Sequence, residues 1–286
     1  MVNDTRPTPL VSTAWLAAHL GDPNLRVVDA TMHLPNAGRD ARTEHEDGHI
    51  PGAVFADIGW LSDESAPFPH TLLGASDFAQ RMGALGIGND TDVVVYDTSG
   101  QNYSAARFWW MMKTFGHANV AVLDGGLPKW TRDGHDVTRD VTPIKPATFV
   151  ATFDAARVRD INAMRRNIDT HEEQVVDARS PGRFRGTEPE PRAGVRGGHM
   201  PGSSNVHYAT LVNHDGTLRS PAELRAIFDA ARVDLGRPVV ASCGTGVTAC
   251  AVILALDVLG AKETAVFDGS WTEWGSATDT PIVTNA

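Results

Sequence analysis

Apolar residues gather in short β-branched runs, and these runs alternate along the chain with longer segments of helical pattern. The run 93–96 is followed by a helical pattern over 105–115 and then by a second run at 120–123. Near the C-terminus, the run 238–242 precedes an apolar segment over 250–259 that is rich in alanine and leucine. Such runs predict buried strands, and the longer segments predict helices. The alternation predicts an α/β fold with mainly parallel sheets and helices on both faces of each sheet.

The second half of the chain repeats the first half. Four blocks recur in the same order, with their two copies at 28–30 and 176–178, 49–52 and 199–202, 94–97 and 240–243, and 122–125 and 266–269. Blocks that recur in register indicate two copies of one domain. We expect an N-terminal domain over residues 1–140, a linker over 141–154 and a C-terminal domain over 155–286.

Composition narrows the possible partners. The chain has 286 residues and a formal net charge of −10, which argues against nucleic acid and anionic membranes as partners. No apolar stretch approaches the ~20 residues of a membrane span, and residues 1–9 are polar without a signal-peptide pattern. Two cysteines cannot form a disulfide framework, and a reducing compartment suits a working thiol. We therefore expect a cytoplasmic protein.

One cysteine stands at the tip of a glycine-rich turn, in the sequence Cys243-Gly244-Thr245-Gly246-Val247-Thr248-Ala249. The two glycines let the loop curl so that its backbone N–H groups point at one spot, and the following helix adds its positive end. Such a cradle stabilises an anion, and a thiolate in it is a nucleophile. The matching position of the first copy is Asp97, which cannot attack sulfur. We expect catalysis in the second copy alone, with the first copy lending surface to a cleft between the domains.

Other interpretations of the same loop explain it less well. A small buried apolar cysteine is one alternative, and the neighbouring Cys250 is expected to be such a core residue. Gly244, Gly246 and Ala249 match the letters of a dinucleotide fingerprint, with Asp268 downstream, but too few residues follow for that fold. A cysteine phosphatase needs an arginine where this chain has alanine. Residues 45–49 match a zinc-protease motif, but Gly48 and a following proline argue against the helix that this motif needs, so no metal is expected.

Several motifs together resemble one known family. They are His49-Ile50-Pro51-Gly52-Ala53, Leu123-Asp124-Gly125-Gly126, the stretch 182–192 (GRFRGTEPEPR) and the Cys243 loop. The chain is identified through them as a member of the tandem-domain sulfurtransferases of the rhodanese superfamily. Members that prefer thiosulfate usually carry Arg and Lys after the cysteine, where this chain has Gly244 and Thr245. The branch that uses 3-mercaptopyruvate usually shows Cys-Gly-Ser-Gly-Val-Thr, so here Thr245 replaces the serine and keeps its hydroxyl.

The resemblance implies a mechanism and roles for named residues. Cys243 would take sulfur from the donor as a persulfide and pass it to a second thiol or to cyanide, with no organic cofactor or metal. Arg183 and Arg192 would hold the carboxylate and keto oxygen of the donor, and the loop residues Gly244, Gly246, Val247 and Thr248 would line its site. Thr245, Asp57 and His70 would assist proton transfer, and Tyr103 would line the cleft from the first domain. The alternatives are a solvated loop role for the arginines, a cap or loop acid for Asp57 and a surface position for His70.

Three functions follow. The first is transfer of sulfur from 3-mercaptopyruvate, with pyruvate as the product and a thioredoxin as a family-based candidate for the thiol acceptor. The second is transfer from thiosulfate, a dianion that should prefer a cationic loop. The third, from a different class, is a persulfide carrier that accepts sulfur on Cys243 without turnover.

Overall fold

The computed structural model describes residues 9–34 and 37–284, and these group into two compact units. Unit 1 contains the chain up to Leu61, Gly74–Phe153 and His214–Thr217, and unit 2 contains Ser62–Leu73, Asp154–Asn213 and the chain from Leu218. The segment Ser62–Leu73 therefore belongs to the second unit although it lies within the first half of the sequence. Residues 1–8, from which the absence of a leader pattern was inferred, lie outside the described residues.

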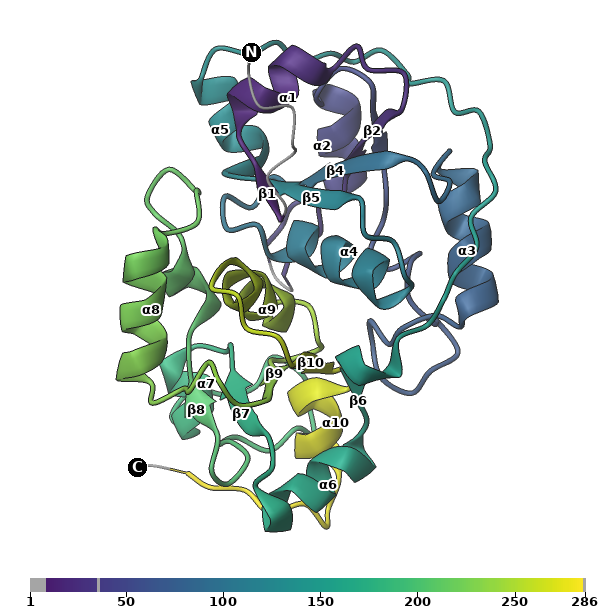
Figure 1. The fold of residues 1–286 in the computed structure, drawn as a ribbon. Helices are drawn as coiled ribbons and strands as arrows, with labels where there is room; N and C mark the ends of the chain where they lie inside the picture. The colour runs from purple at the N-terminus through teal and green to yellow at the C-terminus, as the bar shows by residue number, and fades with distance from the viewer. Residues whose placement is uncertain (1–8, 35–36, 285–286) are drawn as a thin grey trace. The chain divides into compact units, whose positions relative to one another are not determined.

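Unit 1 is built on a parallel sheet of five strands in the order β1-β5-β4-β2-β3 (Figure 1). Its strands are β1 (Leu10–Val11), β2 (Leu25–Asp29), β3 (Ala53–Phe55), β4 (Asp92–Tyr96) and β5 (Val120–Leu123). Its helices are α1 (Thr13–His19), α2 (Ala41–Asp47), α3 (Ala75–Ala84), α4 (Tyr103–Thr114) and α5 (Gly126–Arg132).

Unit 2 repeats this sheet strand for strand in the order β6-β10-β9-β7-β8, again parallel throughout. Its strands are β6 (Val158–Arg159), β7 (Gln174–Asp177), β8 (Ser204–Asn205), β9 (Val239–Ser242) and β10 (Thr264–Phe267). Its helices are α6 (Ile161–Thr170), α7 (Pro181–Arg185), α8 (Pro221–Ala230), α9 (Ala249–Val258) and α10 (Ser270–Ser276), with short 3-10 turns η1 (Ala155–Arg157) and η2 (Tyr208–Leu211). The matching strand orders confirm the α/β fold and its duplication.

Strands β5 and β9, which lie inside their sheets, are buried along their whole length because helices cover them. Every residue of β5 and of β9 is buried. Helix α4 packs against β4 and β5, and α9 packs in the same way against β9 and β10. Helix α9 is buried over eight consecutive residues from Ala249 to Leu256, which explains why its sequence shows no polar face. The nucleophile loop thus lies between a fully buried strand and the buried N-terminal part of a helix, which give it a rigid frame.

The expectation that residues 45–49 avoid a helix was wrong for part of this segment. Helix α2 contains His45 and ends at Asp47, because Asp40 caps its N-terminus and Gly48 serves as its C-cap instead of preventing it. His49 lies beyond the helix, where its Nδ1 is 2.7 Å from the carbonyl oxygen of His45. Among the described residues, no cluster of His, Cys, Asp or Glu has the arrangement of a metal site.

Two further features concern membrane-spanning helices and the segment in which the linker was expected. No helix in residues 9–34 and 37–284 has the length and apolarity needed to cross a bilayer. Residues 141–154, where the linker was expected, contain no helix or strand, and backbone bonds join Ala147 to Gly83 and Thr152 to Phe115. This part of the chain therefore follows the surface of α3 and α4 up to the boundary of unit 1 at Phe153.

Candidate active site

Cys243 directly follows β9, at the carboxyl end of a parallel strand, where ligands bind in open α/β sheets. The loop from Cys243 to Thr248 connects β9 to the N-terminus of α9. Gly246 has φ +78°, a left-handed conformation that favours glycine. At Gly244 a side chain would be crowded, since a Cβ there would lie 3.2 Å from Nη2 of Arg183. One glycine shapes the loop, and the other admits a cation beside it.

The start of α10 holds the cysteine loop in place. The backbone N–H of Cys243 donates to Ser270 Oγ at 3.1 Å, and the N–H of Trp271 donates to the Cys243 carbonyl at 2.9 Å. Thr272 donates to the Gly244 carbonyl from both its N–H and its hydroxyl, at 2.9 and 2.7 Å. These bonds use the N–H of Cys243 and the carbonyls of Cys243 and Gly244. Within the described chain, no acceptor meets the N–H groups of Gly244, Thr245, Val247 and Thr248.

The side chains of Thr245 and His70 contact each other. Their Oγ1 and Nδ1 atoms are 2.8 Å apart, although the residues are 175 positions apart in sequence. His70 reaches this position because the segment Ser62–Leu73 is part of unit 2. His70 also has φ +64°, which is uncommon for a residue with a side chain and often marks a functional site. The pair can pass a proton between the histidine ring and the threonine hydroxyl.

Arg183 supplies the cation beside Gly244. It lies in the short helix α7, which begins at the N-cap Ser180. Glu190 fixes one edge of its guanidinium, since Nη2 is 2.6 Å from Oε2 and Nε is 3.2 Å from Oε1 of this carboxylate. Its remaining nitrogen, Nη1, donates to no group of the described residues. A guanidinium that is bound to a carboxylate along one edge in this way keeps Nη1 as a donor for an anionic ligand.

A series of buried ion pairs connects Arg183 to the end of strand β7. Glu190 also accepts a 2.7 Å hydrogen bond from Nη1 of Arg179, whose side chain is fully buried. Arg179 in turn binds the carboxylate of Asp177 through Nε and Nη2, and its guanidinium stacks over the ring of Trp271 at 4.1 Å. Asp177 is the last residue of β7. The chain of charges therefore connects the sheet to the arginine beside the nucleophile loop.

The remaining expected residues are Arg192, Asp57 and Tyr103. Arg192 is half-buried in the loop after α7, and within the described part of the chain it makes no hydrogen bond or ion pair. Asp57 and Tyr103 lie in unit 1. Asp57 accepts hydrogen bonds from the N–H groups of Gly59 and Trp60, at 2.7 and 3.3 Å, as a turn cap does. The Tyr103 hydroxyl donates to the Met32 carbonyl at 3.0 Å.

The sequence patterns missed Tyr208, the first residue of η2, which packs against α9. Burial raises the pKa of its phenol, the charge of Cys243 raises it further, and Arg183 lowers it. A signal was present in the repeat, because the register of the His-x-Pro-Gly blocks aligns Asp57 with His207 and the next residue with Tyr208. Burial also lowers the pKa of His207, an effect that Glu188 opposes.

The matching loop of unit 1 is filled by its own carboxylate. Asp97 is fully buried. It accepts hydrogen bonds from the N–H and hydroxyl of Ser99, at 2.9 and 2.6 Å, and from the N–H groups of Ser104 and Ala105 at the start of α4, both at 3.1 Å. An anion therefore occupies the N-terminal end of α4, as a helix terminus favours. The first copy retains the cradle and has no thiol in it.

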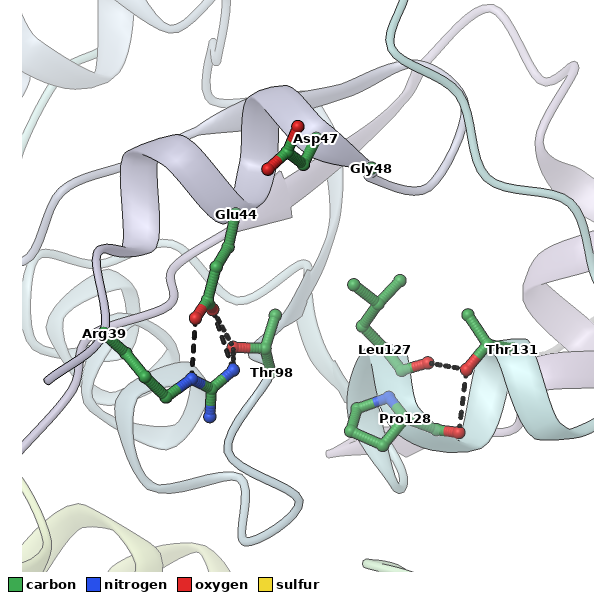
Figure 2. A pocket seen from close by; sticks show the side chains of 8 residues that line it. All are labelled: Arg39, Glu44, Asp47, Gly48, Thr98, Leu127, Pro128 and Thr131. Carbon is green, nitrogen blue, oxygen red and sulfur yellow. Dashed lines mark hydrogen bonds and ion pairs between the residues drawn. The ribbon is translucent and has the colours of Figure 1, made fainter. Parts of the chain in front are cut away.

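A pocket of unit 1 lies beside this loop and is lined by Arg39, Glu44, Thr98 and Pro128, among others (Figure 2). Figure 2 shows the side chains of Arg39 and Thr98 directed at Glu44. Nε of Arg39 donates to Glu44 at 2.6 Å, and the Thr98 hydroxyl donates to it at 3.2 Å. The cation of this pocket is already paired with a carboxylate, and its lining contains no nucleophile comparable to Cys243.

Both halves of the chain match the model of the Rhodanese-like domain, over residues 12–133 and 160–277. The chain is 45% identical over 270 residues to 3-mercaptopyruvate sulfurtransferase of Homo sapiens, covering 93% of this chain and 91% of that protein. It is 40% identical over 295 residues to thiosulfate/3-mercaptopyruvate sulfurtransferase 1, mitochondrial, of Arabidopsis thaliana, covering 96% of this chain and 78% of that protein. The crystal structure of the 3-mercaptopyruvate sulfotransferase SseA of Escherichia coli matches with a TM-score of 0.84 at 38% identity, covering 92% and 98% of the two chains.

Proposed function

The chain belongs to the rhodanese-like domain family, and on that basis we propose that it transfers sulfur from 3-mercaptopyruvate through a persulfide on Cys243 to a thiol or cyanide. The observation that carries the proposal is the 2.8 Å contact between Thr245 and His70 on a cysteine loop that holds no charged side chain. A donor with one carboxylate needs one well-placed cation, and Arg183 supplies it beside Gly244. A thiosulfate dianion would gain more from cations within the loop itself.

In the first half-reaction, the Cys243 thiolate attacks the sulfur of the donor. A sulfur–sulfur bond forms, and the carbon–sulfur bond breaks with its electron pair going to the organic fragment. That fragment leaves as the enolate of pyruvate, and its carbon then takes a proton. His70 and Thr245 form the relay that supplies this proton, because their contact lets the ring nitrogen replace a proton that the hydroxyl donates.

Substrate orientation is assigned to the two arginines of the 182–192 stretch. Nη1 of Arg183 would donate to the carboxylate of 3-mercaptopyruvate, since Glu190 already occupies the other edge of the guanidinium. Arg192, which has no partner among the described residues, would hold the keto oxygen. Backbone N–H groups of the loop from Gly244 to Thr248 would stabilise the negative charge on the reacting sulfur.

The roles of the unit 1 residues rest on the family resemblance. Asp57 would assist the proton relay, and Tyr103 would line the donor site. Their present hydrogen bonds, to the turn after Asp57 and to Met32, fix the positions of both side chains within unit 1. Variants at these two positions separate a role in the reaction from a role in folding, because an active-site role predicts lost turnover at unchanged stability.

In the second half-reaction, a thiolate or cyanide attacks the outer sulfur of the persulfide. The bond between the two sulfur atoms breaks, and Cys243 leaves as the thiolate that starts the next cycle. We propose a thioredoxin as the protein acceptor and the cytoplasm as the location, because both fit a chain with a working thiol whose two cysteines form no disulfide. Activity with reduced thioredoxin, and fractionation of cells, test these two proposals.

The decisive experiment compares 3-mercaptopyruvate and thiosulfate as donors to cyanide, with thiocyanate measured under steady-state conditions. Cys243→Ser is the test variant. Cys250→Ser is the matched control, because Cys250 is buried in α9 and its thiol donates to the Gly246 carbonyl, 3.2 Å away. We expect kcat/KM to favour 3-mercaptopyruvate, and we expect turnover to vanish in Cys243→Ser alone.

Two outcomes would replace the proposal. A higher kcat/KM for thiosulfate would assign the chain to the thiosulfate sulfurtransferases. A Cys243 persulfide that forms but is released to no small thiol or cyanide would assign it to the persulfide carriers, and mass spectrometry of the intact protein detects that species.

A further inference from the structure

The turn after β10 runs into the first residues of α10, and this segment, residues 268–272, contacts both loops of the proposed site. At its later end, Ser270, Trp271 and Thr272 bind the backbone of Cys243 and Gly244, as described above. Ser270 has φ +51°, a left-handed conformation, and its hydroxyl also donates to the Phe267 carbonyl at 2.8 Å. This end of the turn is therefore held firmly to the nucleophile loop.

At its earlier end, the same turn contacts the segment that carries His70. Oδ2 of Asp268 accepts a 2.8 Å hydrogen bond from the N–H of Leu72. Asp268 is only 8% exposed, so this charge-assisted bond is shielded from water. Leu72 is two residues beyond His70 along the chain. The bond from Asp268 thus fixes the backbone directly beside the residue that contacts Thr245.

The Ser62–Leu73 segment has internal bonds that do not themselves attach it to the sheet. Ser62 and Leu72 form an antiparallel bridge, and the N–H of Asp63 donates to the Thr71 carbonyl at 2.8 Å. These bonds close the segment into a hairpin-like loop. The left-handed backbone of His70 needs surroundings that hold it, because a residue with a side chain adopts this conformation at a cost. Asp268 ties this loop to the end of β10.

We propose that Asp268 is a positioning residue for the sulfur-transfer reaction, whose carboxylate holds the Ser62–Leu73 segment so that His70 meets Thr245. The inference rests on the proposed function for its kinetic consequence, and the hydrogen bond on which it depends can be measured without turnover. One short turn then aligns the nucleophile loop through its backbone and the proton relay through one side chain. Asp268 itself acts on neither the donor nor the reacting sulfur.

The test uses Asp268→Ala and Asp268→Asn in the full chain. Alanine removes the acceptor, so we expect kcat to fall about tenfold or more while KM for 3-mercaptopyruvate changes less, as small misplacements of catalytic groups produce. Asparagine keeps an oxygen that the Leu72 N–H can reach, so we expect kcat within about threefold of the wild type. The repeat supplies the matched control, Asp124→Ala, which removes the equivalent aspartate of unit 1 and should leave kcat unchanged.

Hydrogen exchange of the Leu72 amide provides the second measurement. We expect this amide to exchange faster in Asp268→Ala and at the wild-type rate in Asp268→Asn. A folded Asp268→Ala protein with wild-type kcat, or with an unchanged exchange rate at Leu72, would overturn the inference. If the wild type formed no persulfide from 3-mercaptopyruvate, the proposed function would fail while the exchange data still reported on the bond.

Discussion

Replacing Arg183 by alanine tests how the donor is held. The guanidinium uses Nε and Nη2 on Glu190 and keeps Nη1 for a ligand, so the variant loses one charge-assisted hydrogen bond to the donor carboxylate. Such a bond contributes about 1.5–3 kcal/mol, and 24% of the Arg183 side chain is exposed to water, which favours the lower part of this range. A loss of about 1.5–2 kcal/mol corresponds to binding weakened about 10- to 30-fold.

The assay is steady-state formation of pyruvate with a thiol acceptor, together with inhibition by added pyruvate, which carries the same carboxylate and keto groups as the donor. We expect KM for 3-mercaptopyruvate and the inhibition constant of pyruvate to rise together, with a smaller change in kcat. Arg183→Lys should recover little of the loss, because an ammonium group bound to Glu190 has no second fixed donor to offer.

Arg185→Ala is the matched control, since Arg185 lies in the same short helix with an exposed side chain. The reasoning is refuted if the Arg183→Ala protein is folded and keeps both constants within twofold of the wild type. A fall in kcat with both constants unchanged would also refute it, and would place the arginine on the developing enolate.

Three other predictions concern Thr245, Glu190 and His207. Thr245→Val removes the hydroxyl that contacts His70, so kcat should fall about 100-fold, whereas Thr245→Ser should keep most of it; equal rates in both variants would contradict the relay. Glu190→Gln weakens a buried carboxylate bound by two arginines, so the free energy of unfolding in urea should fall by about 2 kcal/mol, and unchanged stability would argue against this network. Because burial holds the pKa of His207 below its value in the unfolded chain, its contribution to stability is complete above the unfolded pKa of about 6.5 and is lost as the pH falls below it. His207→Gln should therefore make the urea midpoint less sensitive to pH below 6.5, and an unchanged slope would count against this assignment.

The elements around the nucleophile could be predicted because the sequence signals there are local. The run 238–242 and the apolar segment after it became β9 and α9 with boundaries displaced by about one residue, and the repeat of four blocks predicted two equivalent sheets. The helix over 41–47 was missed because Gly48 was taken as a helix breaker. In the structure, it is the C-cap at which the helix ends.

The contacts that assemble the site could not be read from local signals. His70 meets Thr245 across 175 residues of sequence, because Ser62–Leu73 belongs to the second unit. Glu190 lies within the motif that suggested Arg183, but residue spacing does not reveal that one carboxylate is shared by two arginines. Tyr208 carries no catalytic signature of its own, and only the register of the repeat indicates its place.

The carboxylate of Asp97 makes the first loop a receptor that carries its own permanently attached ligand. Because the Asp97 carboxylate is fixed beside the backbone N–H groups that it binds, it competes for them at an effective concentration that no dissolved anion reaches in a cell. Donor molecules are therefore not sequestered at the duplicated loop, and a chain saturated with donor should carry one transferable sulfur atom. The chain therefore has two copies of the domain but only one site that can carry sulfur, because the Asp97 side chain occupies the loop of unit 1.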